Sequence, residues 1–311
     1  MFIKGEDKYF TFLFRLIVVC PGEISYTTGC RFLKKFSLGQ YSQKATGGDD
    51  WQKKQKEQRK SMEAYTGFAE VYDQFMNNVP YERWAEYLRG LFLEYGVRNG
   101  LMLELGCGTG TMTEQMAEYG YDMIGVDSSE DMLAEAQEKR MESGHEILYL
   151  QQDMREFELY GTVAGVFSVC DSLNYLLEKE DLVTVFRLVN NYLDPKGIFI
   201  FDFNTAAEYR NPLRKAPIVE TDEDDTMIWE NFFDEESGIN EHRVLFFLKG
   251  EDDRYDKVEE YHEQMAYSLA DMKEALAEAG MEFVAAYAAE TRNAPTETTP
   301  RIYVIARENG K

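Results

Sequence analysis

At 311 residues, the chain is long enough to bury a sizeable hydrophobic core and to form one or two domains. The formal net charge is −24, but residues 1–61 carry 12 Lys and Arg against 6 Asp and Glu, whereas residues 62–311 carry 21 against 51. The acidic main body repels phosphate backbones, so its composition disfavours nucleic-acid substrates unless a local basic patch exists.

The cysteines and histidines show no metal-ligand pattern. The four cysteines form no CxxC pair, and the three histidines are too scattered for a cluster. We therefore expect a reduced, cytoplasmic protein without a structural metal.

Residues 1–61 differ from the rest of the chain. The apolar run YFTFLFRLIVVC (9–20) resembles the core of a signal peptide, but Arg15 interrupts it, acidic residues precede it and no cleavage site follows. The run is also too short to span a bilayer. We predict that the folded protein begins near Met62, and that residues 1–61 are a disordered extension or an upstream region added by a misassigned start codon. A membrane anchor is the alternative.

Residues 62–99 predict a helical cap. Two segments place apolar residues at helical spacing, EAYTGFAEVYDQFM (63–76) and PYERWAEYLRGLFLEYG (80–96).

Strands and helices then alternate through residues 100–204, which is typical of a doubly wound parallel sheet. Ser128 or Ser129 is expected to cap the second helix. The predicted strands are LMLEL (101–105), DMIGVD (122–127), ILYLQQD (147–153), VAGVFSVCD (163–171) and, after the turn DPKG, GIFIFDFN (197–204). The predicted helices are TMTEQMAEYG (111–120), SEDMLAEAQEKRMESG (129–144) and EDLVTVFRLVNNYL (180–193).

Residues 205–267 predict an antiparallel insertion, with strands in TMIWENFFD, NEHRVLFFLKG and DKVEEYHEQMAYS. Residues 268–311 predict a helix, LADMKEALAEAG, and a strand pair, MEFVAAYAAE with RIYVIARE, that complete the core.

The first predicted strand runs directly into the glycine turn LELGCGTG (103–110). A dinucleotide-binding turn has the spacing G-x-G-x-x-G, but Thr111 occupies the position of its third glycine, and Glu104 would repel a pyrophosphate. No G-K-[ST] follows, which disfavours a P-loop. A ligand with both cationic groups and a carboxylate fits the bare backbone and the nearby acid. The alternative for the turn alone is that it is only a tight strand-to-helix connection.

Five motifs at successive strand ends resemble those of the class I S-adenosylmethionine-dependent methyltransferases, over roughly residues 65–307. They are LELGCGTG, GVDSSEDML (125–133), QQDMREF (151–157), VFSVCDSLNYL (166–176) and LDPKGIFIFDFN (193–204). The chain is most similar in pattern to small bacterial members with an inserted antiparallel sheet. The resemblance implies an α/β fold, a doubly wound Rossmann-like methyltransferase sheet with an N-terminal helical cap and an antiparallel β insertion.

The resemblance also implies S-adenosylmethionine as the cofactor and a set of binding residues. The glycines would pass beneath the methionine moiety, Asp127 would hold the ribose hydroxyls, Asp153 and Met154 would flank the adenine, and Tyr72 would cover the cofactor. Singly, Asp127 could be a helix N-cap and Asp153 a surface acid. The full set is Tyr72, Glu104, Gly106, Cys107, Gly108, Gly110, Asp127, Ser128, Asp153, Met154 and Cys170.

Methyl transfer requires a nucleophile in line with the sulfonium carbon, and a general base is optional. In this family the segment CDSLNYL would face the transfer point, which makes Asp171, Asn174 and Tyr175 candidates for acceptor contacts. It lacks the [DN]PP[YF] sequence of enzymes that methylate exocyclic amines of bases. His262 or His242 could act as the base, although a lone histidine in a strand is more often structural. Period two places His262 and Gln264 on one face of their strand, and one face should pack on the core.

We therefore predict methyl transfer from S-adenosylmethionine to a small-molecule acceptor by proximity-driven in-line displacement, with a β insertion acting as the substrate lid. We expect neither a nucleic acid nor a membrane as partner, and the sequence does not indicate the oligomeric state. The alternatives are a methyltransferase that modifies tRNA or another RNA, and a regulatory protein that binds the cofactor without turnover.

Overall fold

A computed structural model describes residues 69–76, 79–222, 224–250 and 254–311. All of these belong to one compact unit, Ala64–Lys311. The predictions for residues 1–61 and for the start of the first cap helix lie outside the described residues.

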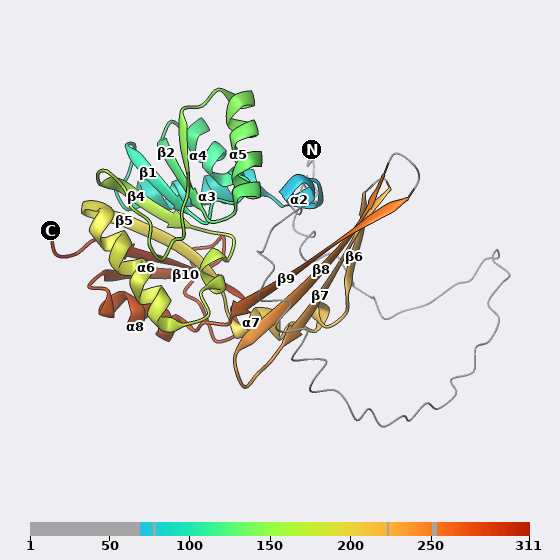
Figure 1. Ribbon diagram of the computed structural model, residues 1–311. Helices are drawn as coiled ribbons and strands as arrows, with labels where there is room; N and C mark the ends of the chain where they lie inside the picture. Colours follow the sequence, from blue (N-terminus) through green and yellow to red (C-terminus); the bar gives the residue numbers. More distant parts are fainter. Residues whose placement is uncertain (1–68, 77–78, 223, 251–253) are drawn as a thin grey trace, which may run out of the picture. The chain divides into compact units, whose positions relative to one another are not determined.

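The core is a seven-stranded sheet of order β10-β11-β5-β4-β1-β2-β3 (Figure 1). β1 to β5 run parallel, and β11 runs antiparallel to both of its neighbours. The strands are β1 (Leu101–Leu105), β2 (Asp122–Asp127), β3 (Ile147–Gln151), β4 (Val163–Ser168), β5 (Leu193–Asn204), β10 (Glu282–Ala288) and β11 (Arg301–Arg307). This arrangement confirms the predicted doubly wound α/β sheet.

Helices cover both faces of this sheet, as its mostly apolar strands require. One face packs against α3 (Tyr81–Glu94), α4 (Thr111–Glu118) and α5 (Glu130–Ser143), through buried residues such as Leu88 and Met116. The other face packs against α6 (Lys179–Tyr192) and α8 (Leu269–Glu278). β1 pairs with β2 on one side and with β4 on the other, so the strand order reverses at β1. In such sheets, ligands bind beyond the carboxyl ends of the strands at this reversal.

The segment DPKG does not form the predicted turn before β5. β5 begins at Leu193, which pairs with Val163, and the register then jumps so that Ile198 pairs with Gly165. Lys196 has a φ of 67° inside this stretch. The four residues therefore form a bulge within β5, because the residues before and after them both pair with β4.

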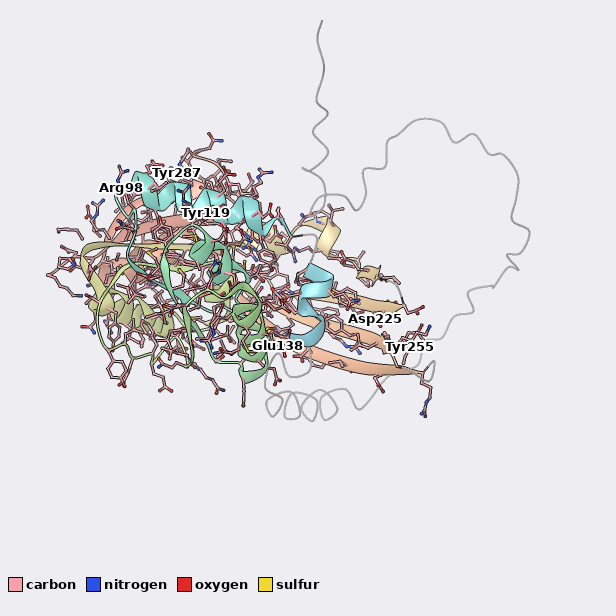
Figure 2. All side chains as sticks on the ribbon, turned by 90° about the horizontal axis from the view of Figure 1, so that it is seen from above. Arg98, Tyr119, Glu138, Asp225, Tyr255 and Tyr287 are labelled. Atoms are coloured by element: carbon pink, nitrogen blue, oxygen red, sulfur yellow. The ribbon has the colours of Figure 1, made fainter. Side chains whose placement is uncertain are left out.

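The insertion is a four-stranded antiparallel sheet of order β6-β7-β8-β9, comprising β6 (Ile218–Asp222), β7 (Asp225–Phe233), β8 (Ile239–Lys249) and β9 (Tyr255–Met265). A short helix, α7 (Ala206–Tyr209), and a 3-10 turn, η2 (Pro212–Arg214), precede it. Figure 2 shows Asp225 and Tyr255 at the ends of β7 and β9 that lie away from the core sheet. The antiparallel insertion was predicted, but β6 was not.

The cap helix α2 (Ala69–Met76) packs between this insertion and α5. Phe75 contacts Phe246 of β8, with ring centroids 5.4 Å apart, and Met132 of α5 belongs to the same apolar cluster. α2 thereby links the insertion sheet to the core.

Candidate active site

The glycine loop between β1 and α4 is open on one side and closed on the other. A Cβ atom added at Gly108, whose φ is 51°, would meet no atom within 4 Å. A Cβ added at Gly110, whose φ is 75°, would lie 2.3 Å from the Tyr149 hydroxyl. The amides of Gly106 and Cys107 donate to the Val126 carbonyl at 2.8 and 3.0 Å, which fixes the loop to the end of β2.

Asp127 at the end of β2 faces this loop. Its Oδ2 accepts a hydrogen bond from the Gly108 amide at 2.8 Å, and its Oδ1 accepts one from the Ser129 amide at 2.9 Å. Burial raises the pKa of this carboxyl, and the backbone amides oppose the shift. Each carboxylate oxygen keeps a further lone pair for a ligand hydroxyl. Ser129, one of the two predicted caps, caps α5 by accepting from the Met132 amide at 3.3 Å.

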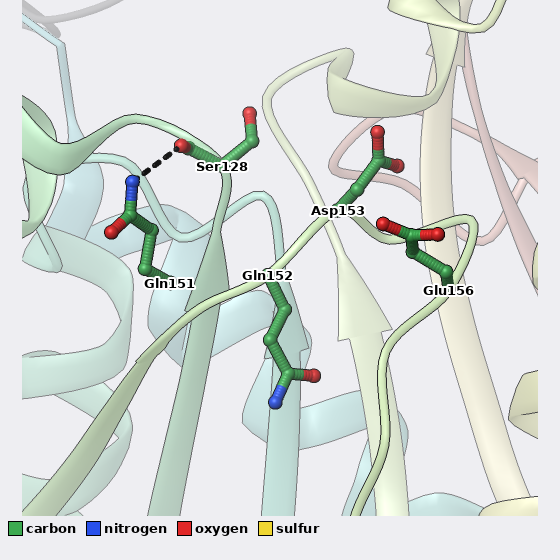
Figure 3. Close-up of a pocket in the computed structure, with 5 residues that line it drawn as sticks. All are labelled: Ser128, Gln151, Gln152, Asp153 and Glu156. Atoms are coloured by element: carbon green, nitrogen blue, oxygen red, sulfur yellow. Dashed lines mark hydrogen bonds between the residues drawn. The ribbon is translucent and has the colours of Figure 1, made fainter.

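An open pocket of about 360 Å³ lies at the ends of β2 and β3 (Figure 3). Ser128 and Asp153 point to the same side, whereas Gln152 points away. Arg155 donates to both carboxylate oxygens of Asp153 through Nε, at 3.0 and 3.1 Å, and these bonds lower the pKa of Asp153. The pocket therefore presents an ionised carboxylate. It is lined by Ser128, Gln151, Gln152, Asp153 and Glu156.

Met154 extends from the same segment toward the glycine loop. Its methyl carbon lies 3.4 Å from the position that a Cβ atom on Gly106 would occupy.

Glu104 is buried beneath the loop, with 2% of its surface exposed. The Thr113 hydroxyl donates to its carboxyl group. Burial raises the pKa of Glu104 to about 8, and the nearby Asp127 adds to this shift while the Thr113 hydrogen bond opposes it. The neighbouring Cys107 thiol has a pKa raised by burial first and by Glu104 second. Among the described residues, no Lys, Arg or His forms an ion pair with Glu104.

The end of β4 has an unusual backbone. Cys170 and Asp171 have φ values of 59° and 55°, in the left-handed region that non-glycine residues rarely adopt. The fully buried Asp202 accepts hydrogen bonds from both of their amides, at 3.3 and 2.8 Å. Arg301 pairs with Asp171 and, at 2.9 Å, with Asp202. Burial raises the pKa of the Cys170 thiol.

The sequence pattern did not single out Asp202 or Arg301. Asp202 lies in the otherwise apolar run GIFIFDFN, and a lone acid in a buried strand normally requires a charged partner. That signal points to a paired carboxylate without revealing its partner, because Arg301 is 99 residues away in the chain.

Asn174 lies in the 3-10 turn η1 (Ser172–Tyr175) and is fully buried. Its amide donates to the carbonyls of Asn204 and Met265 at 2.9 and 2.7 Å and accepts from the Asn204 amide at 2.9 Å. These three bonds hold the ends of β5 and β9 beside η1. The ring of Tyr175, in the same turn, packs edge-on against His262, with centroids 5.9 Å apart.

The polar face of β9 is the buried one. Glu260, His262 and Gln264 are 3%, 6% and 2% exposed, whereas Glu263 on the other face is exposed. Burial lowers the pKa of His262 and of His242 to about 4 each, so both imidazoles are neutral at pH 7. Each of these two histidines would therefore be a weak general base.

α2 is fastened over the glycine loop by polar contacts. Asp73 accepts from the Thr109 hydroxyl at 2.8 Å and pairs with Lys139 at 2.5 Å. Lys139 also donates to the Thr111 hydroxyl at 2.7 Å. Tyr72 lies on the same helix. Burial raises the pKa of its phenol, and the nearby Tyr81 is the next largest cause.

Removing this contact should loosen α2. We expect Asp73→Ala to weaken α2 docking by about 1 kcal/mol, or about fivefold in amide hydrogen exchange over residues 69–76, because it removes one hydrogen bond and one half-exposed ion pair. Arg292→Ala, which breaks the exposed pair with Glu94, is the matched control. Equal exchange in the Asp73 variant and wild type would show that the apolar contacts alone hold α2.

Three comparisons with known proteins bear on this site. Residues 102–197 match a family model described as a methyltransferase domain. A crystal structure of an S-adenosylmethionine-dependent methyltransferase from Clostridium acetobutylicum ATCC 824 superposes with a TM-score of 0.70 at 27% identity, covering 79% of this chain and 99% of that one. YqeM of Bacillus subtilis (strain 168), named as a methyltransferase with no acceptor stated, is 34% identical over 247 residues, covering 79% of this chain and 97% of YqeM.

The chain belongs to the class I S-adenosylmethionine-dependent methyltransferases. Family membership confirms the resemblance and the cofactor predicted from the sequence. A more distant relative, the dTDP-3-amino-3,4,6-trideoxy-alpha-D-glucopyranose N,N-dimethyltransferase of Streptomyces venezuelae, is 29% identical over 136 residues, covering 43% of this chain and 56% of that protein. In the described part of this methyltransferase, no helix has both the length and the hydrophobicity needed to span a bilayer.

The site residues of this methyltransferase fit the cofactor chemically. The open side of Gly108 leaves room for a ligand against bare backbone, and Asp127 has lone pairs left for hydroxyl groups. The pocket at Asp153 offers an ionised hydrogen-bond acceptor. Glu104 is a buried carboxyl group whose charge a cationic ligand would stabilise.

Glu104 should make cofactor binding depend on pH. With a pKa of about 8, Glu104 holds a proton at pH 6 to 7 in the free protein. A cation bound beside it favours the carboxylate and lowers its pKa, so binding releases the proton and affinity rises with pH. We expect the Kd for S-adenosylmethionine to fall about tenfold between pH 6 and pH 7, where the amino group of the ligand stays protonated. Titration calorimetry in buffers of different ionisation enthalpy measures both the affinity and the released proton.

Glu104→Gln is the matched control for this prediction, because it keeps the shape of the side chain and cannot titrate. Its affinity should be nearly constant over the same pH range. A wild-type protein with a flat profile, or a Gln variant with the wild-type slope, would assign the proton to another group or to none.

Proposed function

We propose that this methyltransferase acts on a small-molecule acceptor held between the carboxyl end of β4 and the polar face of the insertion. Asp127 would bind the ribose hydroxyls, Asp153 and Met154 would flank the adenine, and Tyr72 would close over the cofactor. Ser128 would line the adenosine pocket. The methionine moiety would lie against a set of loop and strand-end residues, comprising Glu104, Gly106, Cys107, Gly108, Gly110 and Cys170.

One contact carries the placement of the acceptor. Gln264 on β9 donates to Asp171 at the end of β4, at 2.7 Å, so the insertion meets the core at the strand end where the cofactor methyl group would lie. When bound, S-adenosylmethionine supplies an electrophilic methyl group. Orienting an acceptor beside it can provide most of the rate enhancement, without a dedicated base.

The residues around this point suit such a role. Asp171 is about one-fifth exposed and has both oxygens in fixed contacts, with Arg301 and Gln264, so its carboxylate can accept a hydrogen bond from an acceptor group in a set direction. Asn174 would act indirectly, since its amide is used to hold the ends of β5 and β9. His262 is a neutral neighbour with a low pKa and would serve as a hydrogen-bonding group more readily than as a base.

Two observations support a small molecule as the acceptor. Residues 62–311 carry about 30 more negative than positive charges, which repels a polyanion. The Streptomyces venezuelae relative is named for a sugar nucleotide acceptor.

Transfer of labelled methyl groups tests this proposal. The full-length protein and S-adenosylmethionine carrying a labelled methyl group, at a concentration near the wild-type Kd, would be incubated with small-molecule and RNA fractions of one cell extract, with Asp127→Ala as the control that binds the cofactor more weakly. We expect label in the small-molecule fraction only, and at least several-fold less of it with the control. Label in RNA would favour the tRNA alternative, and tight cofactor binding without label in any fraction would favour a regulatory role.

A further inference from the structure

A chain of hydrogen bonds runs across the insertion to Asp171. The Trp229 indole donates to His242 Nδ1 at 3.0 Å, His242 Nε2 lies 2.8 Å from Gln264 Oε1, and Gln264 Nε2 donates to Asp171 Oδ2 at 2.7 Å. These residues come from β7, β8 and β9 and from the segment between β4 and η1. We call this chain the insertion relay.

The direction of the relay is fixed by its first member. An indole can only donate, so His242 Nδ1 is the acceptor and the proton of the neutral ring lies on Nε2. His242 Nε2 then donates to Gln264 Oε1, which leaves the amide nitrogen of Gln264 as the donor to Asp171. The Asn240 amide nitrogen lies 3.3 Å from His242 Nδ1 and 3.0 Å from His242 Nε2, so it borders the ring beside the relay.

The relay is anchored at Gln264 and at Asp171. Tyr209 also donates to Gln264 Oε1, at 3.0 Å, so the amide is held from two sides. At the far end, Arg301 holds the other oxygen of Asp171. Gln264 is 2% exposed, so water does not compete for these contacts.

The anchored carboxylate belongs to the strained segment at the end of β4. Left-handed backbone costs about 1–2 kcal/mol at each non-glycine residue, so the Cys170–Asp171 pair persists only if its surroundings enforce it. Asp202 of the core accepts from the two amides, and Gln264 of the insertion relay donates to the Asp171 side chain. The orientation of Asp171 is therefore set jointly by the core and the insertion.

We propose that His242 and Gln264 are positioning residues that set the Asp171 carboxylate for methyl transfer through the insertion relay. This inference rests on the proposed function, which places the acceptor beside Asp171. The relay stays in one protonation state near neutral pH, because burial keeps the pKa of His242 at about 4. The hydrogen bond with Gln264 and the charge of Asp171 oppose this shift, and Arg214 adds to it. His262, directly opposite on β9, is neutral in the same range.

Hydrogen exchange tests the relay without any acceptor. We expect Gln264→Leu to speed exchange of the Cys170 and Asp171 amides about tenfold, because the side chain that shares their network loses a buried hydrogen bond. Glu263→Gln, on the exposed face of the same strand, should leave exchange unchanged. Wild-type exchange rates in the Leu variant would overturn the proposal, whatever the outcome of the acceptor screen.

Two variants at His242 separate positioning from simple packing. His242→Gln retains an acceptor and a donor and should keep the slow, wild-type exchange of the Cys170 and Asp171 amides. His242→Phe has neither group and should speed this exchange as Gln264→Leu does. In the labelled-methyl assay at saturating cofactor, we expect Gln264→Leu and His242→Phe to lower kcat about tenfold with the Kd for S-adenosylmethionine within about twofold of wild type. Equal losses in the Gln and Phe variants, or a parallel loss of cofactor affinity, would assign His242 a structural role only.

Discussion

Replacing Asp127 with alanine is expected to raise the Kd for S-adenosylmethionine about 10- to 100-fold, because hydrogen bonds to a charged group contribute about 1.5–3 kcal/mol. The variant should remain folded, since the β2 backbone pairs with β1 and β3 independently of this side chain. Asp127→Asn, which keeps one acceptor oxygen for the Gly108 or Ser129 amide, should show an intermediate loss.

Asp122→Ala is the matched control, because Asp122 is the exposed first residue of the same strand. Calorimetric titration and thermal unfolding of the three variants and wild type separate binding from stability. An Asp127→Ala protein with wild-type affinity would show that the end of β2 does not hold the ribose, and an unfolded one would make its role structural.

The second large effect concerns the closed side of the glycine loop. Gly110→Ala is expected to lower the free energy of unfolding by about 3 kcal/mol, through the left-handed backbone and the overlap with the Tyr149 ring. Gly108→Ala has the left-handed backbone but no overlap, so it should cost about 1–2 kcal/mol. Urea unfolding of the two variants measures the difference.

Cofactor binding should show the opposite order for these two glycines. The methyl group of Gly108→Ala enters the open space in which the cofactor would lie. The affinity of this variant for S-adenosylmethionine should therefore fall more than that of Gly110→Ala. A Gly108 variant with unchanged affinity would place the cofactor away from the bare side of the loop. Equal stability losses at both positions would mean that Tyr149 moves aside without cost.

Much of the core was predictable because its signals are local. DMIGVD is an apolar run bounded by polar turn residues, and it forms β2 with the predicted limits. β6 was not predicted, since IVETD is short, contains two acidic residues among its five, and owes its strand conformation to pairing with β7. The bulge at DPKG likewise depends on β4, which lies far away in the sequence.

The same contrast holds for the site. Gly108, Asp127 and Asp153 stand at strand ends within recognisable motifs, so the sequence placed them together before the fold was known. Arg301 and Gln264 follow no motif and meet Asp171 only after folding. The alternation of residues predicted the two faces of β9 but did not indicate which face is buried. The residues that form hydrogen bonds with the polar face, such as Tyr209, come from other elements.

The most direct test is calorimetric titration of the full-length protein with S-adenosylmethionine and S-adenosylhomocysteine, with NAD as the control ligand. The arrangement of the glycine loop, Asp127 and the Asp153 pocket predicts micromolar binding of the first two ligands and none of NAD. A folded protein that binds neither S-adenosyl compound, or that binds NAD equally well, would contradict the assignment of this site.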